Sequence, residues 1–452
     1  MTQGVASQAA HENGVAANDT DKRHIHILIA GAGLTGLILA QGINKFNASP
    51  EAATHPVKLT YEIFEREPFV FYRGGGYSLT LHWGLQVLQD ALPKEVLDDL
   101  DSCLCNPHFV ETGQTTDFQY LNLRTKEVVV RAPMPKVPVA RVARTRLIKL
   151  LMQGIDVQFS KQLSDISWPA DDRVTAHFAD GTSADGNLLI GADGGKSAVR
   201  RILCGPRAES QPVAVKAVGL RCHYPVEKCA KYQEIDPNIV HGGDPDTNTY
   251  FWFSLLDMPR PNSDRPLAEC YITVNWPFED DFLGKGKPTD VPATRSERIG
   301  FLRHLAEGWA EPLREMIFDL PSETDIREIN LVEWTPEKGM WDNHNGTVTL
   351  IGDSAHAMTP FRGEAANHGI LDAGNILDML LGKKGSGSSD QNLEKMDLKS
   401  LITAYEDEMI ERVGPAVKRS TQACLDATHF EKMRSGSFFV SNRFEKKVAE
   451  ES

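Results

Sequence analysis

Residues 24–43 read HIHILIAGAGLTGLILAQGI, and this stretch decides the fold of the chain. The apolar run from His24 to Ala30 has the composition of a buried strand. Three glycines follow in a G-x-G-x-x-G pattern, at Gly31, Gly33 and Gly36, and an apolar helical pattern continues from them. Glycines at these places let the chain turn, let a pyrophosphate approach the backbone, and let helix and strand pack closely. The stretch therefore predicts a strand, a tight turn and a helix that bind a dinucleotide.

The next predicted strand supplies the acidic residue that such a unit needs. Residues 57–66 (VKLTYEIFER) place Glu65 near their end, where a carboxylate can bind a ribose hydroxyl. Glu65 lies 65 − 31 = 34 residues after Gly31, further than the usual distance of about 20. The predicted loop at residues 47–56 (NASPEAATHP) accounts for the extra length. The alternative is a purely structural contact of helix and strand, with Glu65 as a solvated surface residue.

Composition and charge exclude several classes of protein. The chain has 452 residues, enough for two or three domains, and 41% of them are hydrophobic, as in a globular protein. Because 48 Lys and Arg face 62 Asp and Glu, the formal net charge is −14, which argues against binding nucleic acid. The seven cysteines include no CxxC pair, so we expect neither a disulfide framework nor a metal site. We find no signal-peptide pattern and no apolar run that could span a membrane, and therefore expect a cytoplasmic protein.

The rest of the chain predicts further elements. Residues 141–154 (RVARTRLIKLLMQG) have the pattern of an amphipathic helix, and residues 156–195 alternate like a small antiparallel ribbon. Residues 213–277 are rich in strand formers and predict a sheet with one face on a core or a ligand. Residues 290–320 and the segment that begins at residue 398 have helical patterns.

These patterns divide the chain into five parts. We expect a disordered tail, a first cofactor-binding part, a sheet domain that binds substrate, a second cofactor-binding part, and a helical segment with a C-terminal tail. The corresponding ranges are 1–23, 24–210, 211–340, 341–385 and 386–452.

Two further motifs extend the first one. Residues 189–200 read LIGADGGKSAVR, and residues 349–367 read TLIGDSAHAMTPFRGEAAN. With the glycine motif and the pair Glu65-Arg66, this ordered set resembles the group A flavin-dependent monooxygenases, over most of residues 24–425. The resemblance implies an α/β protein with a Rossmann-like FAD-binding fold similar to p-hydroxybenzoate hydroxylase. It also implies an inserted mixed β-sheet substrate domain and a C-terminal helix.

The resemblance implies roles for matching positions. The glycine motif would hold the FAD pyrophosphate, Glu65 the adenosine ribose, and Asp353 the flavin ribitol. Arg144, in RTRLIKLL, matches the family arginine that reaches the flavin and its phosphates. The remaining positions implied near the cofactor are Arg66, Gly76, Asp193, Gly194, Gly352, Pro360, Gly363, Ala366 and Asn367.

One departure from the family pattern stands in the third motif. The family usually reads GQGAN after the proline, whereas this chain has Glu364 and Ala365 in place of Gln and Gly. Because RGEAANHGI resembles fungal members of the family, we interpret the change as a trait of a sub-family that acts on natural-product intermediates.

The family chemistry implies a non-covalent FAD that NADPH or NADH reduces and that then takes up O2 as a C4a-hydroperoxide. The oxidant resides in the cofactor, so no catalytic triad or metal is needed. The protein must supply a dry cavity and orient the substrate. We expect a small aromatic or indole substrate, a monomer or homodimer, and a place in alkaloid or other secondary-metabolite biosynthesis.

The substrate cavity is predicted from the strand-rich region. Alternating positions in residues 250–253 and 271–276 would line it. Arg221 stands in the earlier predicted strand VGLRCHYP, residues 218–225. The resemblance implies that an arginine on this strand faces flavin and substrate, so Arg221 is a catalytic candidate. His223 lies on the same face of the strand and is a second candidate. The other candidates for the pocket are Tyr77, His82, Tyr250, Trp252 and Tyr271.

Three alternatives stay open at this point. No obvious acid–base pair stands in the strand segments, which favours epoxidation of an indole-type double bond over hydroxylation of a phenolic ring. A non-catalytic protein on the same fold, like the GDP dissociation inhibitors, would lack a working flavin site. An NAD-dependent dehydrogenase would use only the first motif and leave the other two unexplained.

Overall fold

A five-stranded parallel sheet forms the centre of the first unit, in the order β19-β11-β1-β2-β7. The computed structural model describes residues 22–71, 76–114, 116–132, 138–383, 397–434 and 436–441. The strands are β1 (Arg23–Ala30), β2 (Val57–Phe64), β7 (Val157–Gln158), β11 (Leu188–Gly191) and β19 (Val348–Leu350). The strands predicted at 24–30 and 57–66 are therefore confirmed, and the predicted tail 1–23 lies almost wholly outside the described residues.

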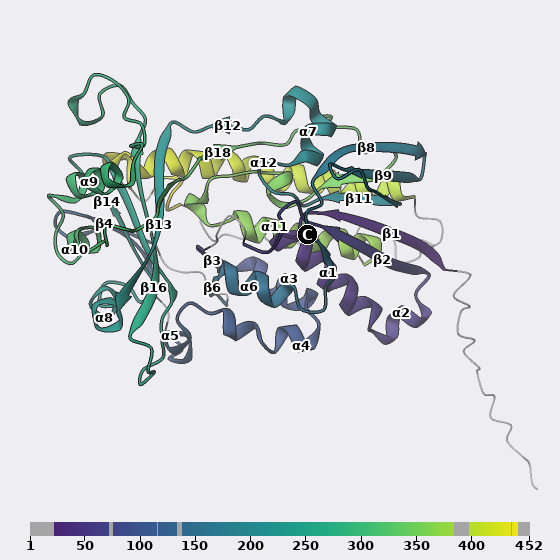
Figure 1. Cartoon of the computed structure of the whole chain (residues 1–452), viewed down its shortest axis with the longest axis horizontal. Coiled ribbons are helices and arrows are strands. Elements are labelled where there is room, and N and C mark those ends of the chain that lie inside the picture. Colours follow the sequence, from purple (N-terminus) through teal and green to yellow (C-terminus); the bar gives the residue numbers. More distant parts are fainter. Residues whose placement is uncertain are drawn as a thin grey trace, which may run out of the picture.

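Both faces of this sheet are covered, which explains its continuous apolar strands. On one face, α1 (Leu34–Asn47) packs with α3 (Trp83–Ala91), α6 (Arg144–Leu151) and α11 (Ala365–Leu380). On the other face lies the predicted antiparallel ribbon, β8 (Leu163–Ala170), β9 (Arg173–Phe178) and β10 (Ser183–Gly186), followed by α7 (Ala198–Cys204). Figure 1 shows this unit on the right.

A seven-stranded mixed sheet forms the second unit, in the order β17-β13-β16-β15-β14-β4-β5. All its pairs are antiparallel except β14 with β4. The strands are β4 (Phe118–Asn122), β5 (Val128–Ala132), β13 (Val215–Pro225), β14 (Ile239–Gly243), β15 (Tyr250–Asp257), β16 (Leu267–Pro277) and β17 (Ile326–Glu328). Because β4 and β5 belong to it, this sheet also draws on residues outside the range 211–340.

Alternation along the strands gives the second sheet two different faces. One face carries Phe251, Phe253, Ile272 and Trp276 into an apolar core with α8 (Val226–Gln233), α9 (Arg295–Ala306) and α10 (Leu313–Phe318). The predicted helices at 290–320 are thus α9 and α10. The other face turns toward the first unit (Figure 1).

Two elements join the units. A two-stranded ribbon of β3 (Ser78–Leu81) and β6 (Ala140–Ala143) lies between the two sheets, and α12 (Leu398–Ala427) spans the length of the molecule (Figure 1). The short remaining elements are α2 (Pro50–Thr54), α4 (Lys94–Leu97), α5 (Pro107–Glu111), β12 (Gln211–Pro212) and β18 (Val332–Glu333).

The helix predicted at 141–154 begins later than its pattern suggests. Residues 140–143 form β6, and α6 starts only at Arg144. Residues 140–143 form a strand and not a helix because they pair in register with residues 78–81. The local sequence pattern does not reveal this partner. Arg141 is therefore a strand residue.

Among the described residues, the structure contains no helix of the length and apolar character that a bilayer crossing requires. The same residues contain no cluster of three or more His, Cys, Asp or Glu side chains that could hold a metal ion. All seven cysteines are buried and free.

Candidate active site

The three glycines after β1 have three different surroundings. Gly31 has a φ of +113°, and a Cβ added there would lie 2.4 Å from the carbonyl oxygen of Ala192. A Cβ at Gly36 would lie 2.1 Å from the carbonyl oxygen of Gly31. A Cβ at Gly33 would meet nothing nearer than 4.0 Å. The fold itself therefore requires Gly31 and Gly36, while the open face at Gly33 fits a ligand that approaches the backbone.

A cavity of about 300 Å³ opens in front of these glycines. Glu65 lies in its wall, where one carboxylate oxygen accepts a hydrogen bond from the Ala32 N–H at 3.0 Å and the other from the Glu67 N–H at 3.1 Å. Arg66 forms an ion pair with Glu67 at 3.4 Å. The wall also contains apolar residues that would suit a planar base: Phe69, Val70, Phe71, Ile148, Met152, Phe159 and Phe178.

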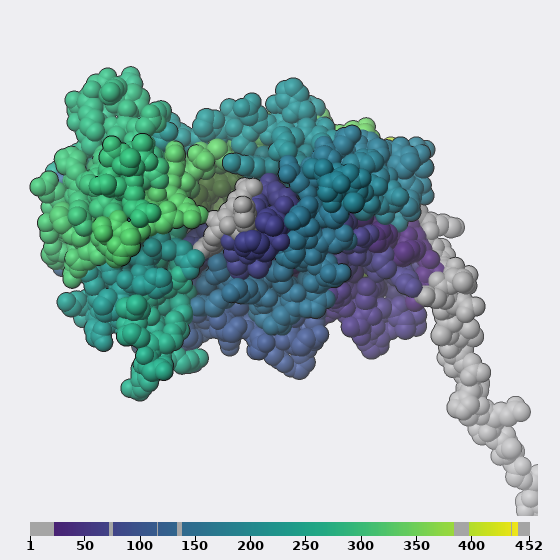
Figure 2. Space-filling model, in the orientation of Figure 1, coloured from purple at the N-terminus to yellow at the C-terminus, as the bar shows by residue number. Residues whose placement is uncertain are grey.

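Arg144 and Asp353 extend the site along the carboxyl ends of the parallel strands. Arg144 lines the cavity as the first residue of α6, and its guanidinium carbon lies 5.5 Å from the ring centroid of Tyr77. Asp353 is open to solvent although it lies deep in the protein, where burial raises its pKa and the charges of His356, Arg144 and Arg200 oppose that rise. The exposed carboxylate of Asp353 lies within electrostatic reach of Arg144 in the cavity wall, a suitable place for a group that binds a polyhydroxy chain. Figure 2 shows the surface hollowed where the two units meet.

The second motif forms the adjoining wall. One oxygen of Asp193 accepts from the N–H groups of Ala198 and Val199 at 2.6 and 3.3 Å, which caps α7, and the other is buried without a hydrogen-bond partner among the described residues. Asp193 and Gly194 both line the cavity.

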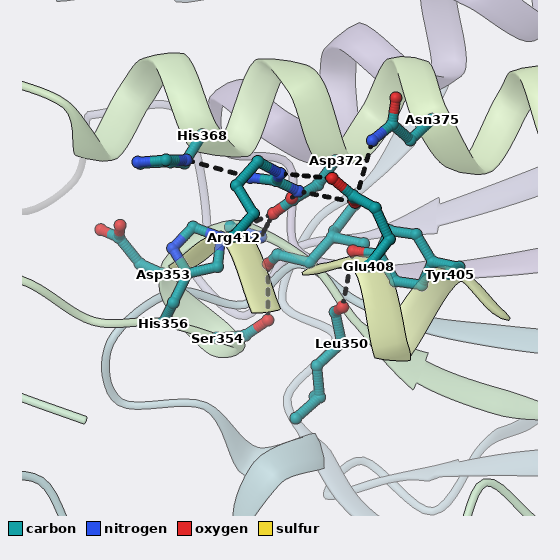
Figure 3. A network of polar contacts seen from close by, with 12 residues as sticks. Leu350, Asp353, Ser354, His356, His368, Asp372, Asn375, Tyr405, Glu408 and Arg412 are labelled. Atoms are coloured by element: carbon teal, nitrogen blue, oxygen red, sulfur yellow. Dashed lines mark hydrogen bonds and ion pairs between the residues drawn. The ribbon is translucent and has the colours of Figure 1, made fainter. Parts of the chain in front are cut away.

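Buried polar contacts fix the third motif from behind (Figure 3). Asp372 of α11 accepts from the Gly352 N–H at 2.8 Å and contacts His356 Nε2 at 2.6 Å through one oxygen. Its other oxygen accepts from Arg412 of α12 at 2.7 Å. Burial alone would raise the pKa of Asp372, but His356 and Arg412 lower it below its usual value, so the carboxylate is ionised. Asp353 points away from this cluster (Figure 3).

Asn367, in the first turn of α11, links this helix to the ribbon between the sheets. Its side-chain oxygen accepts from the N–H groups of His82 and Gly84 at 3.1 and 3.2 Å, and its amide donates to the carbonyl oxygens of Thr80 and Gly363. His82 is buried beside it and holds the loop rather than lining an open pocket. Gly363 adopts a φ of +65°, while Pro360 is exposed and Ala366 half-buried near the start of α11.

Glu364, which replaces the usual glutamine of the family pattern, has a structural partner in Arg362. Glu364 accepts two hydrogen bonds from Arg362, at 2.9 and 3.0 Å, and both side chains are buried. Arg362 also donates to the carbonyl oxygens of Phe438 and Ser441. The pair therefore fastens the C-terminal segment to the loop before α11.

The sheet face that turns toward the crevice carries the predicted aromatic residues. Tyr250, Trp252 and Tyr271 share this face by register, because Trp252 pairs with Thr273 and Tyr271 with Ser254. The Tyr250 ring lies 5.3 Å from that of Phe361, in the loop before α11. Burial raises the pKa of Tyr271 to about 12, so its hydroxyl stays protonated.

Arg221 and His223 lie toward the outer end of the same face. Arg221 is 43% exposed in its side chain and forms an ion pair with Glu269, and His223 is exposed. Gly76 packs against Arg221, because a Cβ there would lie 2.7 Å from the Arg221 Nε, and the adjoining Tyr77 is 46% exposed. The structure thus places Arg221 against Gly76 just before β3, while His223 is an exposed residue two positions further along β13.

Sequence reasoning missed residues that hold the site together. Arg200 is 2% exposed and donates to the carbonyl oxygens of Gly195, Asp353 and Ser354, which ties the second motif to the third. Asp372 and Arg412 were missed as well. Arg200 stands within the second motif, which was a usable signal, whereas no local pattern marks the other two.

Comparisons with known proteins agree with this geometry. The chain is 42% identical over 357 residues to the FAD-dependent monooxygenase tazP of Aspergillus terreus, covering 78% of this chain and 89% of that protein. It is 39% identical over 428 residues to a probable FAD-dependent monooxygenase of Arthroderma benhamiae, covering 92% and 95%. Among solved structures, HpxO of Klebsiella pneumoniae in complex with FAD and uric acid matches with a TM-score of 0.66 at 18% identity, covering 93% of this chain and 93% of HpxO. A salicylate hydroxylase–substrate complex matches with a TM-score of 0.64 at 18% identity, covering 93% and 92%. No protein-family model matches the sequence.

Replacing single glycines should separate folding from cofactor binding. For Gly33→Ala we expect the free energy of unfolding of the apoprotein to change by about 1 kcal/mol or less, because the new Cβ meets no close neighbour. Its affinity for FAD should fall by about tenfold or more, since that Cβ occupies the ligand's path. Gly36→Ala, the matched control, should instead destabilise the apoprotein by about 1–3 kcal/mol. Chemical denaturation and titration of FAD fluorescence measure the two quantities, and a Gly33→Ala protein with unchanged FAD affinity contradicts the assignment.

Removing the charge of Asp372 should destabilise the fold in a pH-dependent way. We expect Asp372→Asn to lose about 3–5 kcal/mol at pH 7, because it removes the fully buried carboxylate that His356 and Arg412 share and leaves Arg412 with Glu408 as its remaining carboxylate partner. The folded pKa of Asp372 lies below its ordinary value of 3.8, so its stabilising effect is present above that value and is lost as the pH falls toward the folded pKa. The difference between wild type and variant in urea unfolding should therefore narrow only below about pH 4. The control is Asp407→Asn, whose exposed ion pair with Lys338 should contribute less than about 1 kcal/mol, and a difference that narrows already between pH 8 and 5 argues against the assignment.

Proposed function

Because the chain belongs to the FAD-dependent monooxygenases, we propose that it uses NADPH or NADH and O2 to oxygenate an electron-rich aromatic small molecule. The observation that carries this proposal is the position of the crevice. Arg144 lines the cofactor cavity, and the exposed carboxylate of Asp353 lies within its electrostatic reach. The aromatic face of the seven-stranded sheet turns toward this unit, and its Tyr250 packs against Phe361 of the third motif.

The residues present fit an FAD molecule. When bound, FAD would supply the electron transfer and the activation of O2. The open backbone at Gly33 would receive the pyrophosphate, Glu65 the ribose, and Asp353 the ribitol chain. The N-terminus of α11 would place free N–H groups near the ring, where they favour negative charge. The protein's remaining task is to keep water out and to hold the substrate in one orientation.

Two kinds of oxygenation fit this site. Epoxidation of an indole needs only an apolar wall, whereas hydroxylation of a phenol is helped by polar groups that stabilise a phenolate. The sheet face that turns toward the first unit carries Ser254 and Tyr271, and Arg141 of β6 lies against it beside Trp252. Polar groups from separate segments therefore meet there in the fold. We therefore favour a hydroxylated aromatic substrate over an indole.

The relatives support this choice and suggest a metabolic setting. One is named as a dual O-methyltransferase and FAD-dependent monooxygenase, elcB of Phaeosphaeria nodorum, at 27% identity over 92% of this chain and 48% of that protein. An O-methyltransferase consumes a hydroxyl group, the kind of group that an aromatic hydroxylase produces. On this basis we place the chain in the biosynthesis of a natural product; a monomeric or homodimeric state stays a prediction.

The alternatives leave more unexplained. A non-catalytic protein on the same fold would have no use for an open Gly33 or a solvent-accessible Asp353. A dehydrogenase with only the first motif would not need Asp353 and Asp372 at the neighbouring strand end. The family relationship also favours the oxygenase over both.

The proposed function predicts that the purified protein is yellow and oxidises NADPH or NADH with O2. Addition of a phenolic aromatic substrate should accelerate this oxidation about tenfold or more, because substrate binding excludes water and aligns the reacting carbon. Nicotinamide absorbance, FAD content and product mass are the measurements. An Asp353→Ala variant serves as the control and should bind FAD less tightly. A colourless protein that cannot take up FAD would falsify the proposal.

A further inference from the structure

Arg141 lies on the ribbon between the two units, in a place that the cofactor-binding residues do not explain. It belongs to β6, one strand away from Ser78 and Thr80 of β3. Its guanidinium carbon lies 5.6 Å from the ring centroid of Trp252, on the chamber-facing side of β15. Ser78 contacts Ser254 of the same strand at 3.3 Å between hydroxyl oxygens. Arg141 thus stands over the sheet face that would receive the substrate.

Two hydroxyl groups fix the orientation of this guanidinium. One terminal nitrogen donates to Thr80 Oγ1 at 2.6 Å and the other to Ser78 Oγ at 2.6 Å. The Nε of Arg141 is buried and has no hydrogen-bond partner among the described residues. A guanidinium has more N–H groups than these two hydrogen bonds use. The remaining N–H groups of Arg141 are therefore fixed in orientation and available to a ligand.

The positive charge of Arg141 has no counter-ion at contact distance within the part of the chain that the structure describes. No carboxylate of the described residues forms an ion pair with it, whereas Arg412 and Arg124 of the same fold each pair with a buried aspartate. Asp236 acts on Arg141 only from beyond ion-pair distance, and burial raises the pKa of Asp236. Burial also lowers the pKa of Arg141, yet an arginine stays protonated in proteins. A buried, uncompensated cation costs stability, and such a cost is typical of a binding site.

The surroundings of Arg141 combine depth with access. Arg141, Thr80 and Trp252 are half-buried, although burial around Arg141 is strong enough to lower its pKa. The same combination marks Asp353 in the cofactor crevice. The half-buried guanidinium of Arg141 thus keeps part of its surface accessible, beside the half-buried ring of Trp252.

Thr80 connects Arg141 to the cofactor crevice. Its hydroxyl accepts from Arg141, and its carbonyl oxygen accepts from Asn367 at 3.0 Å, in the first turn of α11. Three residues after Arg141, Arg144 begins α6 in the wall of the cofactor cavity. Arg141 therefore lies next to the cofactor site on the side of the substrate sheet.

We propose that Arg141 binds an acidic oxygen of the aromatic substrate, a phenolate or a carboxylate. This inference rests on the proposed function and names the substrate class within it. Ser78 and Thr80 hold the guanidinium in place, and Trp252 stacks beside it. The incoming oxygen takes up the remaining N–H donors and supplies the missing negative charge. Arg141 is thus a substrate-binding residue that selects acidic aromatics over their neutral counterparts.

The test compares acidic and neutral probes on the FAD-loaded protein. Naphthol and naphthoate are the acidic probes, and methoxynaphthalene and methyl naphthoate are their neutral counterparts. We expect wild type to bind at least one acidic probe about tenfold or more tightly than its neutral counterpart, read from changes in the flavin absorbance. Arg141→Gln should remove this preference and leave the affinity for neutral probes and for FAD unchanged. The two arms show whether the partner is a phenolate or a carboxylate.

Two further variants control for folding and for charge. Arg141→Lys keeps the cation without the planar fork and should retain part of the preference. Arg131→Gln removes an exposed arginine of β5 and should change neither preference nor Tm. We expect the Tm of Arg141→Gln to equal or exceed that of wild type. If Arg141 had only a structural role, replacing it would lower the Tm.

Four outcomes separate this inference from the proposed function. If FAD binding and oxidation of NADPH or NADH are normal but neutral probes bind as tightly as acidic ones, the role of Arg141 is wrong and the monooxygenase stands. The role is equally wrong if Arg141→Gln keeps the preference, or if wild type binds neither acidic probe. If the protein takes up no FAD, the proposed function fails first.

Discussion

The buried carboxylate of Asp372 is the contact on which the candidate site depends. Through its two oxygens it joins the backbone of Gly352, the ring of His356 and the guanidinium of Arg412. These groups come from the loop after β19, from α11 and from α12, which meet only in the folded chain. Because an ionised group with several partners tolerates little displacement, the cluster fixes the turn that carries Asp353. Asp372 and its partners thus position the turn that carries Asp353, although they do not line the cofactor cavity themselves.

The parts of this arrangement that sequence could predict are the local ones. The strand at 24–30 and the glycine turn depend on neighbours along the chain, and the structure has them as expected. The ribbon predicted at 156–195 is present over residues 163–186, whereas β7 and β11 at the two ends of that range belong to the parallel sheet. Arg141 shows where such reasoning stops, because its amphipathic pattern favours a helix while pairing with residues 78–81 makes it a strand residue. The ion pair of Asp372 with Arg412 spans 40 residues and carries no local signature. Register, in turn, decides which aromatic residues face the crevice: Trp252 does, and Trp276 packs against helices.

The departure at Glu364 shows how a changed motif can keep its place in the fold. A glycine and an uncharged glutamine are the usual residues of the family there, and a lone carboxylate beside the flavin ring would oppose its reduction. Here Arg362 accompanies Glu364 and balances its charge within the same loop. The arginine also donates to the backbone of residues 438 and 441, so the C-terminal segment is fastened to the loop before α11. The substitution therefore exchanges a neutral loop for a paired one that also anchors a distant segment.

Arginines that are buried or half-buried have two different roles in this protein. Arg200 and Arg412 spend their donors on carbonyl oxygens or carboxylates of the protein, and they bind its segments together. Arg144 and Arg141 form no ion pair with the described residues; Arg144 lines the cofactor cavity, and Arg141 is half-buried beside Trp252. Charge left uncompensated at such places weakens the empty protein, and a ligand of opposite charge recovers that loss on binding. The phosphates of FAD would do so at Arg144, and an acidic oxygen of the substrate would do so at Arg141. Two neighbouring arginines, Arg144 and Arg141, therefore carry positive charge without a carboxylate partner among the described residues. This uncompensated charge gives each of them a preference for an anionic ligand.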